Sequence, residues 1–201
     1  MVWNKKVYGL PQEVKKELET NWEKIREEYN SIIESEKLDY MEKDRFWDEG
    51  KWKVFGLRGF PLGERINIDK CAYTHSILDK IPRLRTACFS ILKPKMKIYP
   101  HTGLCDNTRR YHLGLITPKE AFIKIDGIRY SWEEGKILKF DDSLIHEAEN
   151  PTTQERVTLL FDVEEKFSFT LFMVATYKKI MPKHYAKILT FLLPDGYHTK
   201  K

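Results

Sequence analysis

The sequence predicts a mainly β fold, an antiparallel sandwich or barrel with flanking helices at both ends. Between residues 85 and 163, short runs of β-branched and aromatic residues alternate with turn residues such as Asp126-Gly127 and Asn150-Pro151. No helical pattern separates these runs, and consecutive strands without helices between them typically pair antiparallel. The expected strands are Thr86–Leu92, Tyr111–Ile116, Ala121–Ile125, Lys136–Phe140 and Arg156–Val163.

Helical patterns stand on both sides of this region. From Pro11 to Lys37, apolar residues recur at steps of three or four between charges, which predicts one amphipathic helix. A second helix is expected over Asp69–Lys80, because Pro82 cannot continue it. Residues 40–68 are rich in aromatic residues, Gly and Pro and predict short strands joined by turns, whereas residues 167–193 again look helical. The apolar positions of the first helix are Val14, Leu18, Trp22, Ile25 and Tyr29.

Length and composition suit one globular domain. Of 201 residues, 41% are apolar and 13% aromatic, which is enough for a sizeable core. The net charge of +5 is small and dispersed, which argues against a nucleic-acid partner. No run of about 20 apolar residues could span a bilayer, and Met1–Lys6 lacks the apolar core of a secretory signal. Cys71, Cys88 and Cys105 form no CxxC pair, so we expect reduced thiols in a cytoplasmic protein.

Polar side chains at alternate positions in three expected strands predict an anion-binding pocket. Residues two apart on a strand share a face, so Arg110 lies on the same face as His112. Arg156 and Thr158 share a face of the last strand, and Ser90 lies on an earlier one. If these faces line one cavity, its two guanidinium groups could grip a carboxylate bidentately. The alternative is that both arginines are merely solvated on outward faces.

Two histidines suggest a metal site at the mouth of the barrel. His101 and His146 are 45 residues apart, and each stands beside a turn at a strand end. Two neutral imidazoles with open coordination positions suit Fe(II), although ligand type alone also admits Zn or Ni. The usual non-haem iron triad has a carboxylate two residues after the first histidine, where this chain has Gly103. Spacing alone therefore leaves the metal open.

Six sequence blocks follow one another between about Asn67 and Val163. They are Ser90-Ile-Leu-Lys-Pro, Pro100-His-Thr-Gly, Arg110-Tyr-His-Leu-Gly-Leu-Ile-Thr-Pro118, Trp132-Glu-Glu-Gly-Lys136, Phe140-Asp-Asp-Ser-Leu-Ile-His-Glu147 and Arg156-Val-Thr-Leu-Leu-Phe-Asp-Val163. In order and spacing, this part of the chain resembles the aspartyl/asparaginyl β-hydroxylase family of Fe(II)- and 2-oxoglutarate-dependent dioxygenases. Members of this family characteristically use two histidines without the acidic ligand, which agrees with Gly103.

The resemblance implies a double-stranded β-helix (jelly-roll) core and a role for each predicted site residue. His101 and His146 resemble the metal ligands of the family. Arg156 and Ser90 resemble the groups that bind the distal carboxylate of 2-oxoglutarate, and Arg110 and His112 resemble groups near its metal-side carboxylate. We expect one dioxygenase domain over 1–201, with an N-terminal helical and irregular region (1–66), a jelly-roll core (67–163) and a helical C-terminal region (164–201).

The resemblance also implies the reaction. 2-Oxoglutarate and O2 would be consumed, giving succinate and CO2, while an unactivated C–H bond of the substrate is hydroxylated. The expected substrate is amino-acid-like or a peptidyl Asp/Asn side chain. Alternatives are a lipid or fatty-acyl hydroxylase, a halogenase of the same superfamily and, last, a non-catalytic jelly-roll binding module. The C-terminal region is expected to complete the core or a dimer interface, and it also admits peripheral contact with a membrane or an acyl chain; the oligomeric state stays open.

Acidic residues near the histidines have two interpretations. Asp141, Asp142 and Glu147 flank His146 and could orient it, since a metal-bound histidine usually donates its other N–H to an acceptor. The segment Asp141-Asp142-Ser143 suits a hydrogen-bonded loop equally well. Asp106, five residues after His101, is expected to form a turn rather than to ligate the metal.

Overall fold

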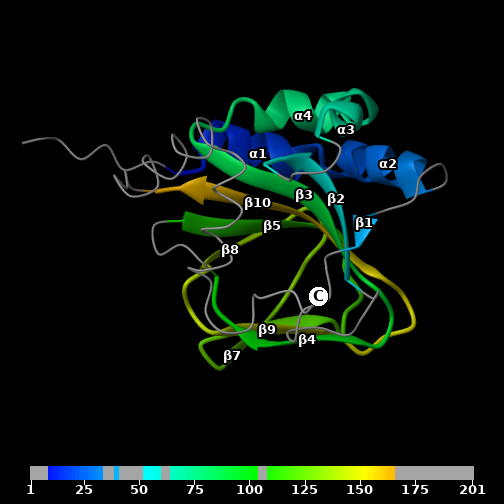
Figure 1. Ribbon diagram of the computed structural model, residues 1–201, viewed down its shortest axis with the longest axis vertical. Helices are drawn as coiled ribbons and strands as arrows, with labels where there is room; N and C mark the ends of the chain where they lie inside the picture. The colour runs from blue at the N-terminus through cyan, green and yellow to red at the C-terminus, as the bar shows by residue number, and fades with distance from the viewer. Residues whose placement is uncertain (1–8, 34–38, 41–51, 60–63, 104–107, 166–201) are drawn as a thin grey trace, which may run out of the picture. The chain divides into compact units, whose positions relative to one another are not determined.

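The computed structural model describes residues 9–33, 39–40, 52–59, 64–103 and 108–165 (Figure 1). These residues belong to the first of two units into which the chain divides, residues 1–166 and 167–201. The expected C-terminal helices lie outside the described residues, and the single-domain organisation stays a prediction. Within the described ranges, no helix is both long enough and apolar enough to span a membrane.

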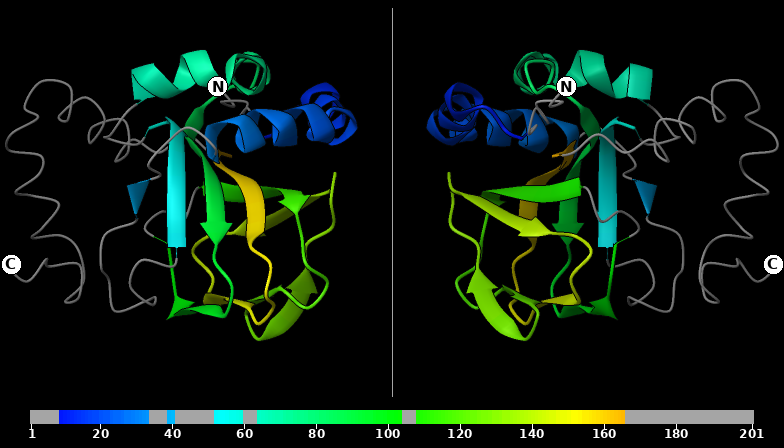
Figure 2. Two further views of the ribbon diagram at one scale, coloured as in Figure 1. Left: turned by 90° about the vertical axis from the view of Figure 1, so that its right-hand side faces the viewer. Right: turned by 90° about the vertical axis from the view of Figure 1, so that its left-hand side faces the viewer.

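The described strands form two sheets in which hydrogen-bonded neighbours run antiparallel, which confirms the mainly β, jelly-roll prediction. Figures 1 and 2 show helices on one side of the larger sheet and the smaller sheet on its other side. The larger sheet has the order β1 (Asp39–Tyr40), β2 (Trp52–Arg58), β3 (Leu84–Leu92), β10 (Arg156–Glu164), β5 (Thr108–Ile116) and β8 (Ile137–Asp141). The smaller sheet has the order β4 (Met96–His101), β9 (His146–Asn150), β6 (Phe122–Ile125) and β7 (Ile128–Ser131).

The central strand β10 is buried on both faces because each face packs against a different layer. Val157, Leu159 and Phe161 join the core that the larger sheet shares with the helices. The alternate residues Arg156 and Thr158 are also buried, on the opposite face. A second apolar cluster, with members from both sheets, fills part of the space beyond that face. The alternation read from the sequence therefore separates a helix-facing core from a polar interior.

The expected helix over Pro11–Lys37 is two helices, α1 (Gln12–Thr20) and α2 (Trp22–Ile33). The break falls at Asn21, whose side-chain amide donates to the Glu17 carbonyl at 2.8 Å, the same carbonyl that accepts its backbone N–H in the last helical bond. Such side-chain bonding to the backbone competes with continuation of a helix. Four of the five predicted apolar positions are nevertheless buried in the core, and Trp22 packs against it.

The expected helix over Asp69–Lys80 is also divided, into α3 (Glu64–Lys70) and α4 (Ala72–Leu78). The second of these begins where Glu28, on α2, accepts hydrogen bonds from the backbone N–H groups of Tyr73 and Thr74, both at 2.8 Å. A carboxylate at a helix N-terminus satisfies N–H groups that have no partner within the helix. Because this cap comes from 45 residues away, no local pattern predicts it.

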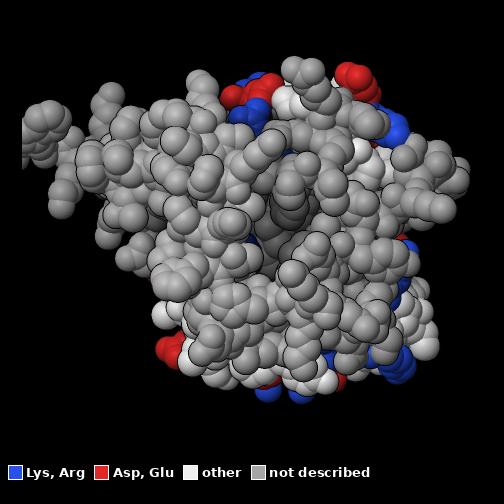
Figure 3. Space-filling view, viewed as in Figure 1, with Lys and Arg blue, Asp and Glu red and all other residues white. Residues whose placement is uncertain are grey.

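The structure extends the strand prediction. The five expected strands correspond to β3, β5, β6, β8 and β10, whereas β4, β7 and β9 were not predicted. Strand β9 alternates histidine, alanine and asparagine inward with Glu147 and Glu149 outward. These glutamates pair with Lys124 and Lys97 of the neighbouring strands, so charged residues cover the outer face of a strand that composition does not favour. On the face shown in Figure 3, described charges of both signs are interspersed along the margins.

Candidate active site

The two predicted metal ligands meet across neighbouring strands. His101 of β4 and His146 of β9 are direct register partners, and their ring centroids are 4.3 Å apart. In each ring Nδ1 lies 2.8 Å from a backbone carbonyl, of Tyr99 and Leu144 respectively. Because a carbonyl only accepts, Nδ1 carries a proton in each ring, and in the neutral form Nε2 then presents a lone pair. Burial, then the neighbouring His101, lowers the pKa of His146 to about 4, which keeps this ring in the neutral form that binds metals.

The position of the missing acidic ligand is filled from another loop. A Cβ atom at Gly103 would lie 1.6 Å from Oδ2 of Asp142, so no side chain fits there while Asp142 keeps its place. The Gly103 N–H donates to the Asp142 carbonyl at 2.7 Å, and Asp142 Oδ1 lies 3.6 Å from Nε2 of His146. Burial raises the pKa of Asp142 to about 6. Among the described residues, no third His, Cys, Asp or Glu completes a metal-binding group with two others.

The sequence left open which acidic residues near His146 orient it and which form a turn, and the structure gives each described one a different position. Asp141 forms a turn, since its carboxylate accepts from the Ser143 N–H and hydroxyl. Glu147 points outward to Lys124. Asp142 is the one that lies at the histidines, and Asp106 falls outside the described residues.

A second part of the site, here called the Arg156 end, consists of Arg156, Ser90 and Thr158. The Arg156 side chain is only 2% exposed, and no carboxylate among the described residues pairs with it. Its Nη1 donates to Thr158 Oγ1 at 2.8 Å, while its Nε is buried without a hydrogen-bond partner. Burial lowers the pKa of Arg156 to about 9. A buried cation with an unsatisfied donor has the chemistry to bind an anion.

The opposite part, here called the Arg110 end, is already neutralised. Arg110 holds Asp162 bidentately, with Nε–Oδ1 at 2.8 Å and Nη2–Oδ2 at 2.9 Å, and its Nη1 lies 2.5 Å from Asp142. Thr86 also donates to the Asp162 carboxylate. Burial alone would lower the pKa of Arg110, but the two aspartates raise it above its ordinary value. This end links the larger sheet to the Asp142 loop beside the histidines.

His112 lies between the two arginines as a buried neutral ring. Burial, then Arg156 and Arg110, lowers its pKa well below 6.5. Its Nδ1 accepts a hydrogen bond from Nε1 of Trp132 at 3.1 Å, and its Nε2 is buried without a partner. A second tryptophan, Trp52, donates to Ser90 Oγ at 3.1 Å. Neither tryptophan was predicted as a site residue, because the pattern within a strand does not reveal a donor that reaches across to another strand.

All six predicted site residues line one pocket, together with both tryptophans and apolar residues of the two sheets. Its free volume is about 30 Å³. The predicted site residues that line it are Ser90, His101, Arg110, His112, His146 and Arg156.

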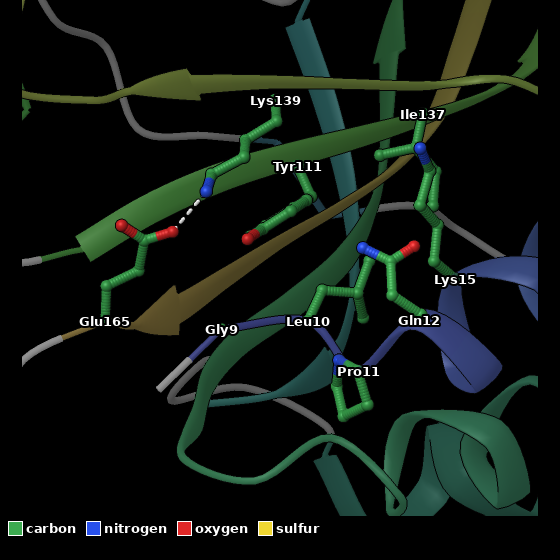
Figure 4. Close-up of a pocket in the computed structure, with 9 residues that line it drawn as sticks. All are labelled: Gly9, Leu10, Pro11, Gln12, Lys15, Tyr111, Ile137, Lys139 and Glu165. Carbon is green, nitrogen blue, oxygen red and sulfur yellow. Dashed lines mark hydrogen bonds and ion pairs between the residues drawn. The ribbon is translucent and has the colours of Figure 1, made fainter. Parts of the chain in front are cut away.

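A larger cavity, of about 540 Å³, lies elsewhere, between the start of α1 and strands β5 and β8 (Figure 4). Leu10, Tyr111 and Ile137 form part of its wall, and Lys139 is paired there with Glu165. No predicted site residue lines it. The larger cavity is therefore separate from the predicted site residues, which line the smaller pocket together with the unsatisfied buried nitrogens of His112 and Arg156.

Solved structures with some similarity to this chain include a predicted oxalate decarboxylase from Thermotoga maritima, with a TM-score of 0.45 and 12% identity over 65% of this chain and 95% of that one. The cupin domain of Schizosaccharomyces pombe Cnp3 has a TM-score of 0.44 and 7% identity over 74% of this chain and 77% of that one. Both similarities are remote.

Sequence relatives are much closer. Ornithine lipid ester-linked acyl 2-hydroxylase of Rhizobium tropici is 36% identical over 159 residues, which cover 73% of this chain and 55% of that protein. Human aspartyl/asparaginyl beta-hydroxylase is 35% identical over 172 residues, which cover 80% of this chain and 22% of that protein. The chain thus spans about half of the first relative and about a fifth of the second. A model of the Aspartyl/Asparaginyl beta-hydroxylase family matches residues 19–166, and the chain therefore belongs to this family of hydroxylases.

Proposed function

We propose that the protein is an Fe(II)- and 2-oxoglutarate-dependent dioxygenase that hydroxylates an unactivated C–H bond. The observation that carries the proposal is Arg156, a fully buried guanidinium with no carboxylate partner among the described residues, in the same pocket as two histidines with Nε2 lone pairs. A buried, unpaired charge is expensive, so its retention favours an anionic ligand. A dicarboxylic acid that also reaches a metal suits both ends of this pocket.

The donor set fits a ferrous ion. His101 and His146 would hold it, because neutral imidazoles with open positions beside them suit Fe(II). When bound, the iron would supply the activation of O2 that hydroxylation requires. Asp142, whose Oδ1 lies 3.6 Å from Nε2 of His146, would accept a hydrogen bond beside the metal, and Gly103 leaves room for its carboxylate.

The other residues would bind and orient the cosubstrate. Arg156 would hold the distal carboxylate of 2-oxoglutarate with the Ser90 hydroxyl beside it, and the His112 Nε2–H would donate to the metal-side carboxylate. Arg110 would contribute positive potential at that end, since its N–H groups already contact Asp162 and Asp142. The apolar lining then excludes water from the reacting groups.

Two substrate classes remain. An amino-acid-like or peptidyl Asp/Asn side chain is the first, as expected from the sequence and supported by the 35% identity to the human relative. A lipid acyl chain is the second, supported by the 36% identity to a protein named as an acyl 2-hydroxylase. Halogenation and non-catalytic binding remain less favoured alternatives, and we retain the cytoplasmic location as an expectation.

The test is turnover of 2-oxoglutarate by the full chain with Fe(II), O2 and a panel of amino acids, Asp/Asn peptides and ester-linked lipids. We expect succinate release that needs Fe(II), and a product heavier by one oxygen atom. His101→Ala and His146→Ala should each abolish both. The matched control His75→Ala, on α4 and paired with Asp79, should retain both. A chlorinated product in chloride buffer would identify a halogenase instead, and absence of Fe(II)-dependent succinate release with every substrate would refute the proposal.

A further inference from the structure

One side chain, Trp132, contacts both pocket groups that carry an unsatisfied buried nitrogen. Its Nε1–H donates to Nδ1 of His112 at 3.1 Å, and the guanidinium carbon of Arg156 lies 4.5 Å from its ring centroid. Trp132 is itself 5% exposed. His112 Nε2 and Arg156 Nε are two of the four buried side-chain polar atoms that lack a partner among the described residues. One indole therefore contacts both of the side chains, His112 and Arg156, whose buried nitrogens lack a partner.

The direction of the hydrogen bond determines where the His112 proton lies. An indole N–H can only donate, so Nδ1 of His112 must offer its lone pair. A neutral imidazole has one proton, and it must then be on Nε2. The charged and titratable groups that face this ring, Arg156, Arg110 and His146, keep it neutral together with burial. The buried Nε2 in the pocket is consequently a donor rather than an acceptor.

We propose that Trp132 is a positioning residue that holds the His112 proton on Nε2 and braces the Arg156 guanidinium, so that the pocket presents donors to an anionic ligand. This inference rests on the proposed function for the identity of the ligand, a carboxylate of 2-oxoglutarate. The reason is electrostatic. With the other tautomer, Nε2 would present a lone pair to the carboxylate and repel it, whereas the indole N–H makes that tautomer unfavourable by leaving two donors facing each other. The ring face of Trp132 adds a cation–π contact that limits the positions of the guanidinium.

The first test reads the tautomer directly, in the metal-free protein and without a ligand. In protein labelled with ¹⁵N-histidine, long-range proton–nitrogen spectra distinguish a protonated from an unprotonated ring nitrogen. We expect the wild-type His112 to carry its proton on Nε2. Trp132→Phe keeps an aromatic ring but removes the N–H, and we expect a substantial population of the Nδ1–H form.

The matched control is Trp52→Phe, which removes the indole donor to Ser90 from the same pocket. It should leave the His112 tautomer unchanged. A proton on Nδ1 in the wild type, or an unchanged Nε2–H tautomer in Trp132→Phe, would overturn the inference. The wild-type measurement decides even if the variant does not fold.

The second test reads ligand binding. The KM for 2-oxoglutarate should rise at least tenfold in Trp132→Phe, the loss expected for a hydrogen bond to a charged group, with a smaller change in kcat. A fall in kcat at unchanged KM would contradict the positioning role. If the wild type has the expected tautomer but no turnover of 2-oxoglutarate, the proposed function fails while the assignment of the proton stands. If 2-oxoglutarate is turned over but the wild-type His112 carries its proton on Nδ1, the proposed function stands and the inference about Trp132 fails.

Discussion

The two buried arginines of the pocket, Arg110 and Arg156, have opposite electrostatic surroundings. Arg110 meets two aspartates, which raise its pKa above the ordinary value although burial acts to lower it. Arg156 is buried with hydroxyl and carbonyl acceptors only, and burial lowers its pKa to about 9. Even Glu155, the preceding residue, directs its carboxylate to Tyr29 and Lys93. The difference shows that the two buried arginines are compensated differently: Arg110 by two aspartates, and Arg156 by no carboxylate among the described residues.

The largest expected effect is on stability at the Arg110 end. Arg110→Met should lower the free energy of unfolding by about 3–5 kcal/mol, because it leaves the buried carboxylates of Asp162 and Asp142 without their cation. Arg156→Met should leave stability unchanged or raise it, since no carboxylate loses a partner. Urea unfolding of the metal-free proteins measures both, with the exposed Arg129→Met as control. Equal losses from the two pocket variants would remove the distinction between the ends.

The second effect is on cosubstrate binding at the Arg156 end. Removing the cation leaves a carboxylate of 2-oxoglutarate buried and unpaired, which costs about 2–5 kcal/mol. The KM for 2-oxoglutarate in Arg156→Met should therefore rise at least about 30-fold at tenfold per 1.4 kcal/mol. Initial-rate kinetics at varied 2-oxoglutarate measure it, and Arg129→Met should keep the wild-type value. A wild-type KM in the Arg156 variant would place the anion elsewhere.

The third effect concerns the loop that links the Arg110 end to the histidines. Gly103→Ala introduces a Cβ that overlaps Oδ2 of Asp142 and should cost about 1–3 kcal/mol of stability, as overpacking of a filled site does. The same substitution should cost clearly less in an Asp142→Ala background, because the overlapping carboxylate is gone. Urea unfolding of the single and double variants measures this coupling. Strictly additive costs would show that the two residues do not share the space.

The smallest effect is a pH dependence from His112, between the two ends. Its pKa in the folded protein lies well below 6.5, so only the unfolded chain takes up this proton as pH falls below 6.5. Stability should consequently fall with decreasing pH, by up to about 1.4 kcal/mol per pH unit for one such group. His112→Asn should remove that share of the slope. Unfolding curves at several pH values between about 7 and 5 compare the two proteins, and identical slopes would contradict a depressed pKa.

Much of the fold follows from local pattern. Period-two alternation in β5 and β10 correctly placed Arg110 with His112 and Arg156 with Thr158 on inward faces, because a strand side chain can point only to one face or the other. The breaks in the two helical regions were not predictable in the same way. Asn21 bonds within its own helix, but the start of α4 depends on Glu28 from a distant helix.

The sequence by itself determined the mainly β class and six candidate site residues, because alternation and residue chemistry are local properties of the chain. Only the tertiary structure decided which arginine is neutralised, that Asp142 fills the space at Gly103, and that Trp132 donates to His112. Each of these depends on atoms from strands or loops distant in sequence. A charge is compensated by whatever lies beside it in space, and chain order does not record that distance.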